Sequence, residues 1–121
     1  MGKINSFEDL IVWQKAIDLS VEVYKLSAKF PKEEIFGLTS QIRRASNSVS
    51  LNISEGSVKT TKTFVNQLRI AKGSAAEVLS GAILSTRLEF VKDNEIIKCR
   101  KLVDEEIKML HALINSLDNK N

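Results

Sequence analysis

Four long segments of the chain carry apolar residues at spacings of three and four, and this pattern restricts the chain to helices. The segments cover residues 7–28, 32–56, 61–89 and 93–118, with short links between them. One proline and five glycines are too few for the many turns of an all-β chain of 121 residues. Because short links make consecutive helices antiparallel, the sequence predicts an all-α fold, an up-down-up-down antiparallel four-helix bundle, in a single domain over residues 1–121.

Residues with strong local preferences mark the ends of these segments. Ser6 precedes Glu8 and Asp9, which is typical of a helix start, because a serine hydroxyl accepts from the first backbone amides and the helix dipole favours acidic residues there. Gly56 is expected to end the second helix in the left-handed conformation, which glycine adopts without strain. The other expected boundary residues are Pro31 at the start of the second helix, Thr60 or Thr61 as the cap of the third, and Asp93 as the cap of the fourth.

The first segment has two adjacent apolar lines, which is a wider face than a single seam of a bundle requires. One line consists of Leu10, Trp13, Ile17, Val21 and Tyr24, and the other of Val12, Ala16, Leu19, Val23 and Leu26. The surplus indicates that this helix packs on something besides its own chain.

Small residues gather in the second and third segments. Residues 40–56 hold five serines and two asparagines, which are indifferent helix formers because their side chains compete for the hydrogen bonds of the backbone. Two interpretations remain open: a crowded interface between helices, or a binding surface centred on the adjacent Arg43 and Arg44. In the third segment Gly73 and Gly81 each cost a helix about 1 kcal/mol, which suggests that they permit the close approach of another helix.

Basic side chains are concentrated in the middle of the chain. The net charge is +3, yet residues 41–72 alone carry +5, and the parts before and after carry −1 each. Such clustering is typical of an anion or nucleic-acid surface, although a run of solvated lysines gives the same count. Adjacent arginines point about 100° apart on a helix, so one of the pair is expected to be exposed and the other engaged in the bundle or at an interface. The candidate nucleic-acid-binding residues are Arg43, Arg44, Lys59, Lys62, Arg69 and Lys72, and the last two lie one turn apart on one face.

The side chains that catalysis and metal binding need are sparse. His111 is the single histidine and has Lys108, not glutamate, three residues before it, so the di-iron motif of bundles is absent. Cys99 and His111 are twelve residues apart on one helix, about 18 Å along its axis, and cannot form a catalytic pair. The spacing of a phosphate-binding glycine loop is also absent. We therefore expect no enzymatic activity, no metal and no cofactor, with His111 at the surface.

Two further expectations concern burial. Glu55 and Glu77 are the carboxylates expected to face inward, and pairing with Arg43 or Arg44 explains them better than acid–base catalysis does. Cys99 falls on the apolar line of the fourth segment, so we expect a buried free thiol in a reduced, cytoplasmic compartment. We expect neither a leader peptide nor a membrane span, since the apolar runs are far too short.

Four blocks of the sequence together carry a family resemblance. They read Phe7-x-x-Leu10-x-Val12-Trp13-Gln14-Lys15-Ala16, Phe30-Pro31-x-Glu33-Glu34-x-x-Gly37-Leu38-x-x-Gln41-Ile42-Arg43-Arg44-Ala45, Asn52-Ile53-x-Glu55-Gly56 and Leu68-x-Ile70-Ala71-Lys72-Gly73-Ser74-x-x-Glu77. Over nearly its whole length the chain resembles the bacterial four-helix-bundle proteins encoded in intervening sequences of large-subunit ribosomal RNA genes. It departs from the usual pattern at Ser50, Ser54 and Lys72, where proline, alanine and arginine are common.

The resemblance implies a small helical protein that assembles into a ring-like homopentamer. It also implies kinship with the accessory proteins of diversity-generating retroelements, which bind nucleic acid and a reverse transcriptase. No settled biochemical role is implied for the members encoded in ribosomal RNA genes.

Two functional hypotheses follow. The first is a non-enzymatic homo-oligomeric bundle that binds structured RNA, or RNA–DNA intermediates, through a basic surface in residues 41–72. The alternative is a protein-binding scaffold, for example an accessory subunit of a reverse transcriptase, in which Arg43 and Arg44 form salt bridges across an interface and touch no nucleic acid.

Overall fold

A computed structural model describes residues 6–118 of the chain. These residues form four long helices, and short 3-10 turns precede three of them. In chain order the elements are η1 (Phe7–Asp9), α1 (Ile11–Ser27), η2 (Lys32–Glu34), α2 (Leu38–Ser57), α3 (Thr61–Arg87), η3 (Asp93–Ile96) and α4 (Ile97–Asp118).

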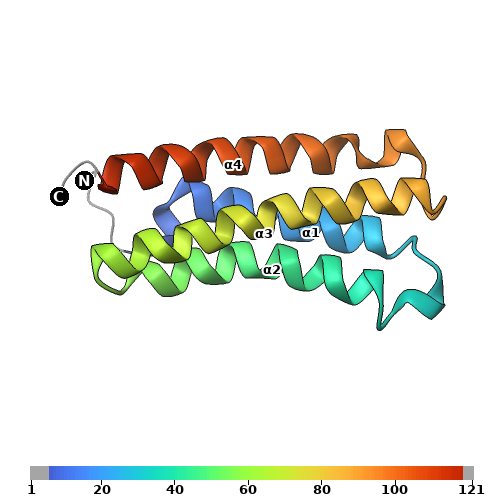
Figure 1. The fold of residues 1–121 in the computed structure, drawn as a ribbon, viewed down its shortest axis with the longest axis horizontal. Coiled ribbons are helices and arrows are strands. Elements are labelled where there is room, and N and C mark those ends of the chain that lie inside the picture. Colours follow the sequence, from blue (N-terminus) through green and yellow to red (C-terminus); the bar gives the residue numbers. More distant parts are fainter. Residues whose placement is uncertain (1–5, 119–121) are drawn as a thin grey trace.

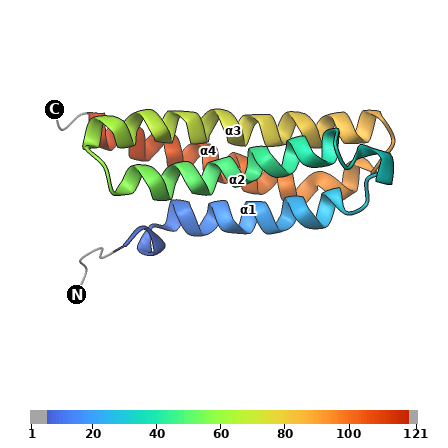
Figure 2. The same ribbon diagram turned by 90° about the horizontal axis from the view of Figure 1, so that it is seen from below.

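The four helices run alternately up and down and form one elongated bundle (Figures 1 and 2). α1 and α3 each pack against both α2 and α4, so α1 lies diagonally across from α3. This arrangement confirms the predicted up-down-up-down four-helix bundle. A side-chain contact in each pair of neighbouring helices fixes the order: Tyr24–Asn47, Ser48–Ser74, Arg69–Asp118 and Lys15–Glu105.

The bundle core consists of the apolar line of each helix. In α1 it is the line of Val12, Ala16, Leu19, Val23 and Leu26 that is buried. The facing line of α3 includes alanines with no exposed surface, Ala71, Ala75 and Ala82, which let the neighbouring backbones approach. Cys99 of α4 is a buried free thiol, as predicted.

The second apolar line of α1 stays largely at the surface. Ile17, Val21 and Tyr24 are 36%, 50% and 41% exposed and follow one another at spacings of four and three, so they form one stripe. Leu51 of α2 is also exposed and lies one turn after Asn47, which donates to the Tyr24 hydroxyl. The surplus apolar face predicted for the first segment is therefore a continuous surface of the single chain, the α1/α2 apolar stripe.

The first two helices begin later than predicted. Leu10 adopts an extended conformation and separates η1, which Ser6 caps by accepting from the Glu8 amide, from α1. η2 is likewise followed by a turn, and α2 begins only at Leu38, whose amide donates to Glu34 Oε1 at 2.9 Å. In both places a 3-10 turn stands where a continuous helix was expected, because the chain must change direction to enter the bundle.

Gly56 does not end the second helix, contrary to our prediction. α2 continues to Ser57, and Val58 follows it with φ −100°. Gly56 is instead buried at the crossing with α3: a Cβ at this position would lie 2.9 Å from Phe64 Cδ1 and 3.2 Å from Gln67 Cβ. Its small size allows the end of α2 to contact the start of α3. Thr60 then caps α3 as predicted, accepting from the Thr63 amide.

The two glycines inside α3 do not behave alike. A Cβ at Gly73 would have no neighbour within 4 Å, so the expected close helix approach is wrong there. A Cβ at Gly81 would meet Ile42 of α2 at 3.4 Å, which is an ordinary van der Waals distance.

The link from α3 to α4 contains the single non-glycine residue with positive φ among the described residues. Glu89 has φ 63°, and the amides of Glu89 and Phe90 donate to the carbonyls of Thr86 and Ser85. This is the Schellman arrangement that closes helix ends. The next turn begins at Lys92, whose amide donates to Glu95 Oε1, so Asp93 is not the cap that the sequence suggested.

Candidate nucleic-acid interface

Ser48 and Asn52 of α2 face α3 and form a polar ladder with it. The Ser48 and Ser74 hydroxyls lie 2.9 Å apart, and Asn52 Nδ2 donates to the Ser48 carbonyl at 2.8 Å. Gln67 Nε2 of α3 donates to Asn52 Oδ1 at 3.4 Å and to Glu55 Oε1. These contacts support the first of the two interpretations of this stretch, a crowded interface between helices.

The prediction that the carboxylates of Glu55 and Glu77 face inward is wrong. Glu55 is exposed and pairs with Lys59 and Gln67, not with Arg43 or Arg44. Glu77 is exposed on α3. The carboxylate in the core is Glu106 of α4, which has no exposed surface.

As expected, one of the two adjacent arginines is engaged in the bundle and the other is exposed. Arg43 is half-buried against α1, where its Nε donates to Ser27 Oγ at 2.8 Å and its guanidinium lies 4.7 Å from the centroid of the Tyr24 ring. Arg44 is exposed on the outer side of α2. Arg44 is therefore the member of the pair available to a partner.

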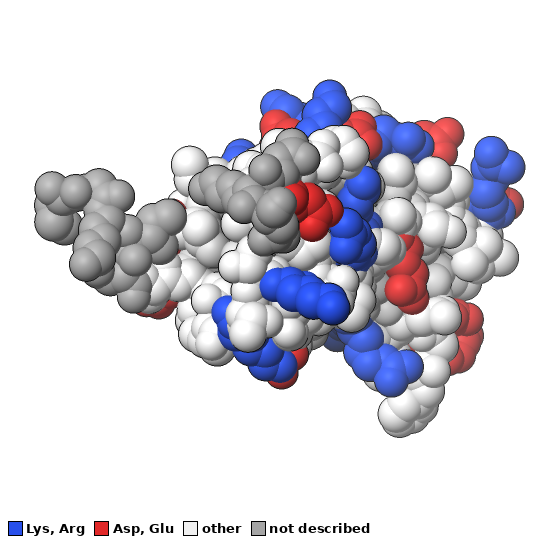
Figure 3. Space-filling view, turned by 60° about the vertical axis from the view of Figure 1, so that its left-hand side comes forward, with Lys and Arg blue, Asp and Glu red and all other residues white. Residues whose placement is uncertain are grey.

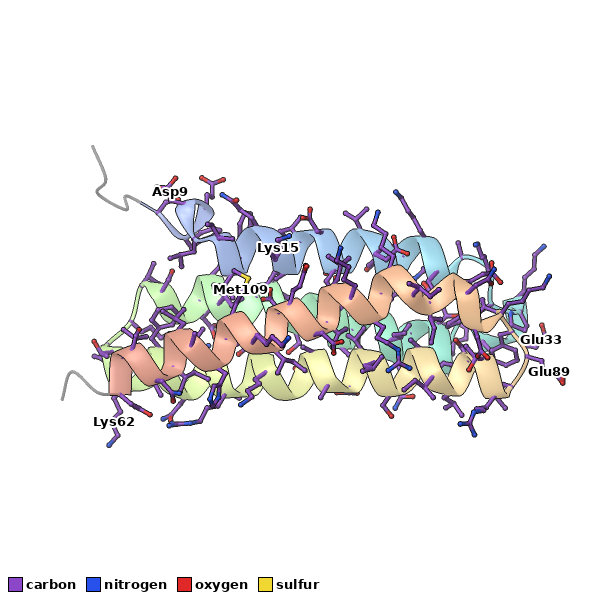
Figure 4. The ribbon with its side chains drawn as sticks, turned by 90° about the horizontal axis from the view of Figure 1, so that it is seen from above. Asp9, Lys15, Glu33, Lys62, Glu89 and Met109 are labelled. Atoms are coloured by element: carbon purple, nitrogen blue, oxygen red, sulfur yellow. The ribbon has the colours of Figure 1, made fainter. Side chains whose placement is uncertain are left out.

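Lys59 and Lys62 lie at the end of the bundle where α2 turns into α3. Lys59 Nζ lies 3.7 Å from the Glu55 carboxylate. Lys62 is exposed and points away from the bundle (Figure 4).

Arg69 and Lys72 lie side by side on α3 and face α4. Arg69 Nη2 donates to Asp118 Oδ2 at 2.6 Å, and Lys72 Nζ lies 3.2 Å from His111 Nδ1. Asn115 of α4 lies 3.2 Å from the other ring nitrogen of His111. The structure thus groups two sequence-predicted residues with three polar residues of α4.

Four of these side chains, Arg69, Lys72, His111 and Asn115, line an open groove between α3 and α4, here called the α3/α4 groove. Its volume is about 490 Å³. Basic and polar groups form its sides, while its floor is apolar. The lining residues are Arg69, Lys72, Gly73, Ala76, Ile107, His111, Ile114 and Asn115.

Sequence reasoning placed His111 at the surface, which is correct, but did not connect it with Lys72. The sequence signal for this cluster was the spacing of His111, Asn115 and Asp118, which puts all three on one helix face. Matching that face to Arg69 and Lys72 requires the register between α3 and α4, which the sequence does not supply.

The six candidate residues do not form one patch on the single chain. Arg43 contacts α1 from α2, whereas Arg69 and Lys72 lie in the α3/α4 groove. The pair α1 and α2 lies on the opposite side of the bundle from the pair α3 and α4 (Figures 1 and 2). On the face shown in Figure 3, Lys and Arg side chains are interspersed with Asp and Glu. The α3/α4 groove is the place where basic residues of the stretch meet other donors around a depression.

The interior holds two titratable groups, Glu106 and Cys99. Burial raises the pKa of Glu106 to about 8, and Lys15 of α1 lowers it. Neither carboxyl oxygen has a hydrogen-bond partner among the described residues. Lys15 instead extends toward α4 and pairs with Glu105 at 3.5 Å (Figure 4). Burial and the charge of Glu22 raise the pKa of the Cys99 thiol to about 11.

Neither group belongs to a metal centre in the described part of the chain. Residues 6–118 contain no group of three or more His, Cys, Asp and Glu side chains placed to hold a metal ion. None of the described helices is long and apolar enough to span a bilayer.

The fold and its surface define a small all-helical bundle with a basic, partly apolar groove along one side. The model of the 23S rRNA-intervening sequence protein family matches residues 8–112, and the chain belongs to that family. A crystal structure of a protein of unknown function from the S23 ribosomal protein family of Bacteroides thetaiotaomicron has a TM-score of 0.78 and 24% sequence identity, and the match covers 86% of this chain and 98% of that one. This similarity shows the shared fold. No curated protein matches the chain.

Proposed function

We propose that this protein is a non-enzymatic homo-oligomer, a pentamer of four-helix bundles, that binds structured RNA through basic side chains of residues 41–72. The observation that carries the proposal is the α3/α4 groove, where Arg69 and Lys72 of this stretch meet the polar side chains of His111 and Asn115. Arginine and lysine on an open surface bind phosphate without reading sequence, which suits a structured RNA backbone. The exposed Arg44 and Lys62 supply further contacts.

The α1/α2 apolar stripe supports assembly. Ile17, Val21 and Tyr24 of α1 run beside the exposed Leu51 of α2, and a stripe of this kind is covered most simply by another copy of the chain. The family resemblance implies five copies. Repeating a weak phosphate-binding surface in each copy raises the affinity for a long RNA without any new contact.

Assembly is tested by light scattering on the wild type and on Val21→Glu. The variant places a charge in the middle of the stripe, so we expect it to be monomeric while the wild type gives five times the monomer mass. Ile97→Glu is the matched control, because Ile97 is also exposed, on α4, but lies outside the stripe. An oligomer that persists in Val21→Glu, or a monomeric wild type, would contradict the proposed assembly.

RNA binding is tested by fluorescence anisotropy with a labelled RNA hairpin at several salt concentrations. We expect binding that weakens steeply with salt, since each phosphate contact contributes about 0.7–0.9 to the slope of log K against log salt. The variant that replaces Arg44, Lys62, Arg69 and Lys72 with glutamine should bind weakly and with a flatter slope.

The control variant loses the same amount of charge outside the basic stretch. It replaces four exposed residues with glutamine: Lys25, Lys32, Arg100 and Lys101. Its affinity should fall much less. Weak binding with no salt dependence in the wild type would reject the RNA-binding proposal.

A protein partner is the second candidate, and one observation favours it. Phe36 is 94% exposed beside the half-exposed Ile35, at the end of the bundle between α1 and α2. Large apolar side chains at such an exposure are typical of protein-binding sites. A scaffold of this kind, for example for a reverse transcriptase, is supported if RNA binding fails and Phe36→Ser abolishes capture of a purified enzyme.

A further inference from the structure

We propose that the α3/α4 groove is the subsite that binds the phosphates of the RNA backbone. In the free protein the Asp118 carboxylate pairs with Arg69, and a bound phosphate displaces it. The inference rests on the proposed function and names the part of the surface that carries it. This subsite combines Arg69 and Lys72 with residues of α4, which lie outside the basic stretch.

The groove presents donors of the types that bind phosphate. Arg69 offers a planar guanidinium and Lys72 an ammonium, and both reach the same depression from adjacent turns of α3. His111 and Asn115 line the opposite side. A phosphodiester in the groove therefore meets the two cationic groups of α3 and the amide of Asn115 on α4, while the sugar can contact the apolar lining residues Ile107 and Ile114.

The contacts of His111 define how Lys72 is held. A lysine ammonium only donates, so His111 Nδ1, at 3.2 Å from Lys72 Nζ, is the accepting atom of this contact. The amide nitrogen of Asn115 lies 3.2 Å from the other ring nitrogen, so His111 stands between Lys72 and Asn115. His111 therefore positions Lys72 beside the groove, and two of the three ammonium protons remain free for an anion.

The contact between Arg69 and Asp118 shows that this arginine binds an oxyanion presented from α4. The distance of 2.6 Å is that of a charge-assisted hydrogen bond. Both side chains are about half exposed, 53% and 42%, so water screens the ion pair and it stabilises the fold only weakly. Asp118 is also the last residue of α4, where the helix dipole disfavours a negative charge. A phosphate can therefore replace this carboxylate at small cost.

Gly73 keeps the groove open. It lies in the lining between Arg69 and Ala76, and a Cβ there would meet nothing within 4 Å. A large side chain at this position can fill the groove without displacing the core. The site can thus be blocked without changing its charge.

The test measures RNA affinity by anisotropy for Asp118→Asn and for Asp104→Asn, an equal change of charge at another exposed acid of α4. We expect Asp118→Asn to bind three- to ten-fold more tightly than Asp104→Asn. This gain in affinity should disappear in the background of Arg69→Gln, because Arg69 is the group with which the Asp118 carboxylate pairs. A gain that persists without Arg69, or equal affinities of the two variants, would overturn the inference.

A blocking pair completes the experiment. Gly73→Phe should weaken RNA binding at least ten-fold and Gly73→Ala should leave it nearly unchanged, with circular dichroism and light scattering equal to those of the wild type. Wild-type binding that survives Gly73→Phe and instead depends on Arg44 and Lys62 would reject the groove and leave the proposed function standing. Absence of RNA binding in the wild type and in Asp118→Asn would reject both.

Discussion

The Arg43 guanidinium lies over the Tyr24 ring, 4.7 Å from its centroid, and joins α2 to α1. The same side chain donates to Ser27 Oγ, and the Tyr24 hydroxyl accepts from Asn47. The first arginine of the pair is thus part of the packing of the bundle, while Arg44 faces solvent.

This difference predicts unequal effects of two neighbouring substitutions on stability. Arg43→Ala should lower the free energy of unfolding by about 1–2 kcal/mol, because it removes a cation–π contact and a hydrogen bond. Arg44→Ala should change it by less than about 0.5 kcal/mol. Urea unfolding followed by circular dichroism measures both, and an equal loss in the two variants would show that the contact with Tyr24 does not stabilise the fold.

Much of this architecture is predictable from the sequence, since apolar spacing reports the helices and short links dictate their direction. What the pattern does not supply is the register of one helix on the next. Without it, Ser48 could not be paired with Ser74, Asn52 with Gln67, or Lys72 with His111. The starts of α1 and α2 were also missed, because 3-10 turns and helices share their local signals.

Glu106 makes stability depend on pH. Its pKa in the folded protein, about 8, lies above its usual value of 4.5, so the folded state holds the proton more tightly than the unfolded chain does. The free energy of unfolding should therefore fall as the pH rises from 4.5 to 8, by up to about 1.4 kcal/mol per pH unit, and this carboxyl should have no effect outside that window.

Glu106→Gln should abolish this loss, because glutamine resembles the protonated acid. At pH 8 we expect the variant to be more stable than the wild type by about 2 kcal/mol or more, and at pH 4.5 to be nearly equal to it. Glu105→Gln, an adjacent but partly exposed acid, is the control and should keep the dependence on pH. Parallel curves for the wild type and Glu106→Gln would contradict a neutral buried carboxyl.

Two glycines should respond to alanine with opposite signs. Gly73→Ala adds a methyl group in open space and should stabilise α3 by about 0.5–1 kcal/mol. Gly56→Ala puts a Cβ 2.9 Å from Phe64 and should destabilise the protein by about 1–3 kcal/mol. Thermal unfolding distinguishes them, and a loss of stability in Gly73→Ala would mean that α3 has a closer neighbour there.

Cys99 should be inert in the folded protein. Because burial raises its pKa to about 11, there is almost no thiolate at pH 8 and no access for a reagent. We expect no reaction with a disulfide dye under native conditions and complete reaction in urea. Ser80→Cys adds an exposed thiol on α3 as a positive control. Rapid modification of Cys99 itself would indicate that α4 opens readily.

The polar ladder between α2 and α3 affects which sequence changes the fold tolerates. Apolar core side chains can exchange neighbours when one helix slides by a turn, whereas Ser48, Asn52 and Gln67 lose their partners. A diverged relative can therefore repack its valines and leucines and still align these two helices in the same way, as long as the ladder remains. The register between α2 and α3 is therefore set by a few small hydrophilic side chains rather than by the apolar core.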